Sequence, residues 1–193
     1  IPGGEETAEN GKWVPGPGYD LFKVVKEEVG DLNIIAEDLG NIDDKTRKLL
    51  ADCGYPGMKI VQFGFYDTTG NSIDIPHVYT HHSVAYTGTH DNEVINGWYG
   101  NFAQEQRYYT DAYINRRQGE PFTRALLRTL FATGSNTAIA TMQDILDKPE
   151  NSRTNFPNTV GENWKWRMLP GEITVDKKEF LTDITERYNR GNK

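Results

Sequence analysis

The chain has 193 residues, of which 36% are hydrophobic and 25% are charged, an ordinary composition for a folded globular domain. Its formal net charge is −7 and it contains no block of lysines or arginines, so neither nucleic acid nor an anionic membrane is an expected partner. Cys53 is the only cysteine and no apolar run approaches the roughly 20 residues of a membrane span. These features predict a cytoplasmic protein without an intrachain disulfide.

Residues 1–19 are rich in glycine and proline, which predicts an irregular segment. The chain opens on Ile1 rather than on methionine, so we expect a processed product or a piece of a longer protein. A first helix is predicted over 20–30, with Asp20 as its N-cap. A short apolar strand over 33–36 then leads directly into Glu37.

The rest of the chain alternates between the patterns of helices and strands. A second helix is predicted over 43–53, capped by Asp43 or Asp44 and closed by Gly54. The other predicted elements are strands over 58–65, 84–88 and 137–142, helices over 103–117 and 121–131, and an amphipathic helix near the C-terminus. Short, continuously apolar strands that alternate with helices are typical of a parallel sheet covered by helices.

Polar side chains follow three of the predicted strands. Glu37 follows the first strand, His90 and Asp91 follow the third, and Gln143 and Asp144 follow the last. The carboxyl ends of parallel strands meet at one rim, so we expect Glu37 and Asp91 to lie there together. Paired carboxylates suit glycoside chemistry, in which one acid donates a proton and others remain ionised. An acid after a strand can also cap the next helix, and the spacing leaves that alternative open.

The histidines offer a competing interpretation as a metal site, formed by His77, His81, His82, His90 and Asp91. However, no glutamate stands between His77 and His81, and the segment lies in a proline-marked loop rather than on a helix. The chain also contains no G-x-S-x-G elbow, no G-x-G-x-x-G and no P-loop. We therefore expect neither a metal nor an organic cofactor.

Five ordered motifs carry a family resemblance: "IIAEDLG", "GYPGMKIVQFGF", "IPH" followed by "SVAYTGTHDN", "MQD" and "NFPNTVGENWKWRM". Together they resemble the C-terminal part of the 4-α-glucanotransferases, the amylomaltases or disproportionating enzymes of glycoside hydrolase family 77. The opening "IPGGEETAENGKWVPGPG" resembles the segment after the family's fourth barrel strand. The resemblance implies an α/β fold, the C-terminal half (strands 5–8) of a (β/α)8 TIM barrel with its helices outside. Residues 1–193 would form one piece of it, without the N-terminal half.

The resemblance also implies residue roles. Glu37 matches the general acid/base after the fifth strand, and Asp91 matches the acid that stabilises the transition state. His90 would bind sugar beside Asp91. Three further positions fall where the family contacts glucose units, namely Asp67, Gln143 and Asn155. The stretch "RTNFPN" departs from the family's usual R-M-N-x-P at Thr154.

Family members transfer α-1,4-glucan segments between maltodextrins by a retaining mechanism, so the implied ligands are maltooligosaccharides or starch-type glucans. The family's nucleophile is an aspartate in an R-x-D-H-type motif, which this sequence lacks. We therefore expect the chain to be inactive alone and to pair with the missing N-terminal half or a second copy. An α-glucan hydrolase of the α-amylase class and a non-catalytic glucan-binding fragment remain alternatives.

Overall fold

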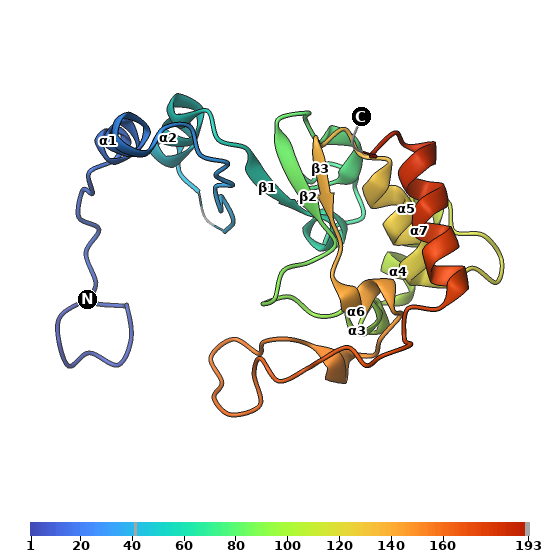
Figure 1. Ribbon diagram of the computed structural model, residues 1–193. Helices are drawn as coiled ribbons and strands as arrows, with labels where there is room; N and C mark the ends of the chain where they lie inside the picture. The colour runs from blue at the N-terminus through green and yellow to red at the C-terminus, as the bar shows by residue number, and fades with distance from the viewer. Residues whose placement is uncertain (41, 192–193) are drawn as a thin grey trace. The chain divides into compact units, whose positions relative to one another are not determined.

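The computed structural model describes residues 1–40 and 42–191. They fall into two compact units, a first over Ile1–Pro56 and a second that begins at Gly57 (Figure 1).

The first unit contains two helices, α1 (Tyr19–Val29) and α2 (Asp44–Cys53). The caps predicted for the second helix are confirmed. Asp43 Oδ1 accepts hydrogen bonds from the Thr46 amide at 2.8 Å and from its hydroxyl at 2.7 Å. Gly54 ends α2 with a φ of 69°, a left-handed conformation that glycine adopts without steric cost.

Two expectations for the first unit are wrong. The N-cap of α1 is Gly18, and Asp20 lies in the first turn, where its carboxylate faces the positive end of the helix dipole. Residues 33–36 do not form a strand, because only Ala36 takes part in an isolated bridge. Its amide donates to the Pro56 carbonyl at 3.0 Å, and a single bond of this kind does not make a ladder.

Residues 1–40 and 42–56 include no buried residue. Several large apolar side chains of this unit are about half exposed or more, including Leu21 at 49%, Val24 at 53% and Trp13 at 103%. Its structure therefore rests on helix caps and local pairs such as Lys48–Asp52, not on a hydrophobic core of its own.

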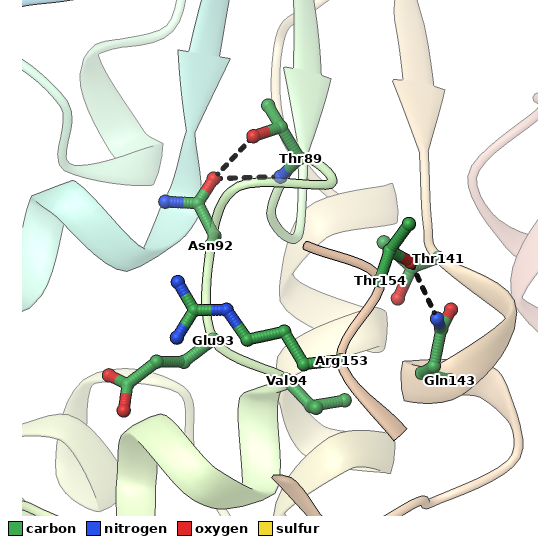
Figure 2. Close-up of a pocket in the computed structure, with 8 residues that line it drawn as sticks. All are labelled: Thr89, Asn92, Glu93, Val94, Thr141, Gln143, Arg153 and Thr154. Atoms are coloured by element: carbon green, nitrogen blue, oxygen red, sulfur yellow. Dashed lines mark hydrogen bonds between the residues drawn. The ribbon is translucent and has the colours of Figure 1, made fainter. Parts of the chain in front are cut away.

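The second unit is built on a parallel sheet with the order β1-β2-β3. Its strands are β1 (Gly57–Ile60), β2 (Ser83–Tyr86) and β3 (Thr137–Ile139). Val84 lies opposite Met58 on one side and Thr137 on the other. The predicted parallel order is confirmed for these strands. Figure 2 shows the carboxyl ends of β2 and β3 leading toward Thr89 and Thr141.

Helices cover the sheet, and α5 lies between it and α7 (Figure 1). The helices are α3 (Ile95–Gly100), α4 (Gln104–Tyr113), α5 (Phe122–Phe131), α6 (Met142–Ile145) and α7 (Val175–Arg187). The predicted helices over 103–117 and 121–131 correspond to α4 and α5, and the amphipathic C-terminal helix to α7. The short helix α3 has no predicted counterpart.

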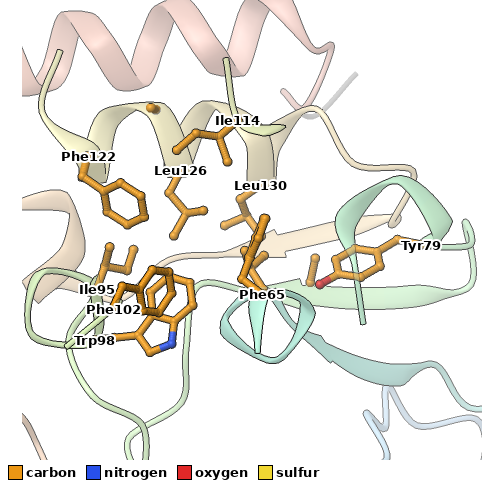
Figure 3. Packing of buried hydrophobic residues seen from close by; sticks show 12 residues of the cluster. Phe65, Tyr79, Ile95, Trp98, Phe102, Ile114, Phe122, Leu126 and Leu130 are labelled. Atoms are coloured by element: carbon orange, nitrogen blue, oxygen red, sulfur yellow. The ribbon is translucent and has the colours of Figure 1, made fainter. Parts of the chain in front are cut away.

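The core of this unit lies between the sheet and the helices (Figure 3). Its members are Val61, Phe65, Tyr79, Ala85, Ile95, Trp98, Phe102, Ile114, Phe122, Ala125, Leu126 and Leu130. The Trp98 and Phe102 rings meet edge to face with centroids 4.5 Å apart, and the Phe65 and Tyr113 rings do so at 5.1 Å. This geometry is favourable for aromatic pairs, so the core fixes the frame on which the loops are held.

All three strands are shorter than predicted, and local contacts explain the two largest differences. The run 58–65 leaves the sheet at Ile60 and continues as the 3₁₀ helix η1 (Val61–Phe65), in which Gly64 passes closely against the Asp74–Ile75 backbone. The run 137–142 ends its strand at Ile139 because Thr141 is the N-cap of α6. Gln143 and Asp144 therefore lie on a helix and not at the end of a strand.

Gly64→Ala should lower the free energy of unfolding by about 1–3 kcal/mol, because overpacking forces the backbone to move. A Cβ at this position would lie 2.5 Å from the Asp74 carbonyl oxygen and 2.8 Å from the Ile75 Cα. Gly100→Ala is the matched control, since its added Cβ has no atom within 4 Å apart from its chain neighbours and the backbone of its own helix. Urea denaturation of both variants measures the difference, and equal stabilities would contradict the close approach.

Candidate active site

The turn after β2 carries His90 and Asp91, and it is held by its own side chains. Asn92 Oδ1 accepts from the Thr89 amide at 2.8 Å and from the Thr89 hydroxyl at 2.9 Å (Figure 2). The Asp91 amide donates to Thr89 Oγ1 at 3.2 Å. The bond from the Asp91 amide to Thr89 Oγ1 is of the ST-turn type, and together with the Asn92 bonds it stabilises a tight turn from which His90 and Asp91 project.

His90, Asp91 and Asn155 form one cluster. His90 Nε2 lies 3.2 Å from Asp91 Oδ2, and Asn155 Nδ2 donates to Asp91 Oδ1 at 2.5 Å. The main-chain amide of Asn155 also donates to the main-chain carbonyl of His90 at 3.1 Å. The side chains of His90 and Asp91 are 50% and 49% exposed. Both carboxylate oxygens are thus oriented while about half of the side chain remains accessible to a ligand.

Trp164 lies against this cluster. The centroids of the Trp164 and His90 rings are 4.9 Å apart with an interplanar angle of 38°. Trp164 has a φ of 64°, an uncommon value for a bulky residue, and its amide donates to the Thr154 carbonyl at 2.7 Å. The indole therefore flanks the imidazole from a loop that is far along the chain.

Gln143 of α6 binds residues 152–154, the segment that precedes Asn155. It is 8% exposed, and its Nε2 donates to the Ser152 carbonyl at 3.1 Å and to Thr154 Oγ1 at 3.0 Å. Thr154, the departure from the family motif, thus provides an acceptor for Gln143. Between these residues and the Asp91 turn lies a cavity of about 20 Å³, roughly the space of one water (Figure 2).

The remaining predicted site residues lie apart from this cluster in sequence. Asp67 is exposed after η1, and its Oδ1 accepts from the amide and the hydroxyl of Thr69, each at 2.7 Å. These hydrogen bonds lower the pKa of Asp67. Glu37 is exposed in the first unit, directly after Ala36. Because Glu37 and Asp91 belong to different units, their shared rim stays a prediction.

The comparisons with known proteins decide the family. The family model described as 4-alpha-glucanotransferase matches residues 1–173. The chain belongs to this family.

Individual glucanotransferases agree with this assignment. The 4-alpha-glucanotransferase of Streptococcus pneumoniae serotype 4 is 50% identical over 193 residues, which cover 100% of this chain and 38% of that protein. That of Clostridium butyricum is 38% identical over 188 residues, which cover 97% of this chain and 38% of that protein. The amylomaltase from Streptococcus agalactiae in complex with acarbose is 58% identical, with a TM-score of 0.96 over 100% of this chain and 39% of that one. The chain therefore spans less than two fifths of the length of these glucanotransferases.

Asp144 is a buried structural acid, contrary to its predicted place after a strand. It is 2% exposed. Its Oδ2 accepts from the hydroxyls of Thr87 at 2.6 Å and Thr141 at 2.7 Å, and its Oδ1 accepts from the Ile95 amide at 2.9 Å. Burial raises the pKa of Asp144, and the three hydrogen bonds oppose that shift. The residue joins the end of β2 to the first turns of α3 and α6.

The sequence analysis did not predict a role for Arg153 or Glu150 in the site. Arg153 Nη2 donates to the Asp91 carbonyl at 2.6 Å, and Arg153 Nη1 lies 3.2 Å from Glu150 Oε1. Arg153 belongs to the quoted motif "RTNFPN", yet its partner stands 62 residues earlier, so no local pattern relates the two.

The described residues contain neither a cluster of metal-ligand side chains nor a helix that could span a membrane. Within 1–40 and 42–191, no group of three or more His, Cys, Asp and Glu side chains could hold a metal ion. His77, a member of the competing metal site, instead places Nδ1 3.0 Å from the Tyr113 hydroxyl. The described part of the chain also has no helix with the length and apolar character needed to cross a membrane.

Asp144→Ala should lower the free energy of unfolding by about 2–5 kcal/mol, because buried donors lose their acceptor. The matched control is Asp183→Ala, which removes an acid that is 53% exposed and paired with Arg187. An exposed pair of this kind contributes about 1 kcal/mol or less. Chemical denaturation at pH 7 compares the two, and similar losses would contradict a structural role for Asp144.

The stability that Asp144 contributes should also depend on pH. Since its pKa is raised in the folded state, the part of its contribution that depends on protonation is fully present below the unfolded pKa of about 3.9 and is lost as pH rises through the folded pKa. The stability of the wild type relative to Asp144→Asn should therefore fall as pH rises above about 4. Urea titrations across this range measure that difference, and a rise with pH would contradict the direction of the shift.

Proposed function

We propose that this chain is the C-terminal part of an enzyme that transfers α-1,4-glucan segments between maltodextrins by a retaining mechanism. The observation that carries the proposal is the His90–Asp91–Asn155 cluster, in which a half-exposed carboxylate is oriented through both oxygens after a strand of a parallel sheet. Membership of the 4-alpha-glucanotransferase family supports it.

The fold proposed for the whole enzyme is a (β/α)8 barrel. In it β1, β2 and β3 take the places of strands 6–8, and the segment around Ala36 takes the fifth place. Residues 1–19 follow the fourth strand, and the N-terminal half belongs to the remainder of the enzyme. The parallel order of the sheet supports this arrangement, as does the lack of any buried residue in the described part of the first unit.

In the proposed mechanism Glu37 and Asp91 have different roles. Glu37 protonates the glycosidic oxygen that leaves, and as a carboxylate it then takes the proton from the 4-hydroxyl of the incoming glucan. Asp91 stabilises the positive charge that develops on the sugar ring, and His90 donates a hydrogen bond to a ring hydroxyl. The nucleophilic aspartate comes from the N-terminal half.

The other predicted residues bind glucose units or support those that do. Asn155 lies at the cluster itself, and Asp67 offers an exposed carboxylate whose lowered pKa keeps it ionised. Gln143 acts mainly through residues 152–154, which its amide holds. Acarbose, which the Streptococcus agalactiae amylomaltase binds, is the ligand that we expect this site to take in the complete enzyme.

In the full-length enzyme, Asp91→Asn and Glu37→Gln should each lower kcat for maltotriose disproportionation by about 100-fold or more. The amides keep the shape of the acids but cannot carry the charge or transfer the proton. Acarbose binding, measured by calorimetry, should persist. The controls are Asp183→Asn and Glu179→Gln, exposed acids of α7 that should leave kcat unchanged. Wild-type turnover in either site variant would refute the role assigned to that residue.

The 193-residue chain alone should convert no maltotriose. A retaining mechanism needs a nucleophile roughly 5–5.5 Å from the acid/base, and this sequence lacks the family's R-x-D-H motif. Chromatography of the products separates the alternatives. Longer maltodextrins at a rate near that of the full-length enzyme would contradict a missing nucleophile, whereas glucose and maltose without longer products would indicate a hydrolase.

A further inference from the structure

The loop over 150–156 contacts the turn that carries Asp91. Arg153 Nη2 donates to the main-chain carbonyl of Asp91 at 2.6 Å, and Arg153 Nε donates to the main-chain carbonyl of Asn155 at 2.9 Å. One guanidinium group thus binds the backbone of both residues that meet through the Asp91 carboxylate. The Arg153 side chain is only 15% exposed, whereas that of Asp91 is 49% exposed.

Glu150 holds the guanidinium in place. Its Oε1 lies 3.2 Å from Arg153 Nη1, and its Oε2 accepts from the Val94 amide at 3.0 Å. Val94 stands three residues after Asp91, so the Glu150–Arg153 pair binds the main chain at Asp91 and again at the end of the turn. We call this ion pair the clamp.

The surroundings of the clamp fit its geometry. A Cβ on Gly97 would overlap the Glu150 side chain, so only glycine leaves room for it in this position. The guanidinium carbon of Arg153 lies 5.0 Å from the centroid of the Phe156 ring, a cation–π contact. The clamp also uses three separate N–H directions, to Glu150, Asp91 and Asn155, which the planar fork of arginine offers and lysine does not.

We propose that Arg153, oriented by Glu150, is a positioning residue that sets the place of the Asp91 carboxylate during glucan transfer. This proposal rests on the proposed function of the site. Arg153 acts through the main chain of Asp91 and through Asn155, without touching the sugar. A displacement of about 1 Å in a reacting group lowers a rate by up to about 100-fold, so a modest shift of the turn has a large effect.

The test uses the full-length enzyme with Arg153→Ala and Arg153→Lys, and it records kcat and KM for maltotriose together with the thermal midpoint. Arg153→Ala should lower kcat by about 10–100-fold while KM changes by less than about threefold. Arg153→Lys should recover only part of the loss. Guanidinium chloride at a non-denaturing concentration should raise kcat of Arg153→Ala and not that of the wild type.

The matched control is Arg124→Ala. Arg124 also forms an arginine–carboxylate pair, with Asp176 at 2.6 Å, but it lies in α5, its partner lies in α7, and neither is a site residue. Gly97→Ala provides a second route to the same result, because it displaces Glu150 while Arg153 stays in the sequence. Gly97→Ala should show the same fall in kcat at nearly constant KM. It therefore tests the proposal even if Arg153→Ala does not fold.

Three results would overturn the positioning role while the wild type remains active. They are a folded Arg153→Ala with wild-type kcat, a rise in KM at constant kcat, and a fall in kcat that only matches the fall in folded protein. The second of these would make Arg153 a direct substrate contact. A wild-type enzyme that transfers no glucan would overturn the proposed function, and the positioning role with it.

Discussion

The buried carboxylate of Asp144 joins the parts of the second unit that have to meet at the carboxyl end of the sheet. Through Thr87, Thr141 and Ile95 it connects β2 with the starts of α6 and α3. Each of these elements is short, and short helices gain little stability from their own hydrogen bonds. Their relative position therefore depends on a tertiary contact, and the turn that carries His90 and Asp91 lies between two of the points that Asp144 fixes.

The loop that follows α6 completes the site through residues 152–155. Gln143 holds residues 152–154 from the α6 side, and Arg153 and Asn155 bind the Asp91 turn from the loop side. Asp91 thus combines a rigid main chain with a half-exposed side chain. Such a combination suits a group that has to meet a changing charge without moving, because reorganisation at the moment of reaction costs rate.

The sequence predicts this arrangement only where the information is local. The apolar strands at Val84 and Thr137 and the cap at Asp43 follow from patterns within a few residues, and the structure confirms them. The early end of β1 could not be predicted, because it depends on Gly64 approaching a backbone segment ten residues further on. The role of Arg153 escaped for the same reason, since its partner is distant and the fold alone brings the two together.

The separation between Asp91 and Arg153 has a consequence for biosynthesis. The carbonyl of Asp91 accepts a hydrogen bond from Arg153, which lies 62 residues later in the chain. At about 5–20 residues per second, translation supplies that donor roughly 3–12 seconds after Asp91 has been made. The turn therefore leaves the ribosome without Arg153, and the nascent chain orders the main chain at Asp91 only when the loop that follows α6 has also emerged.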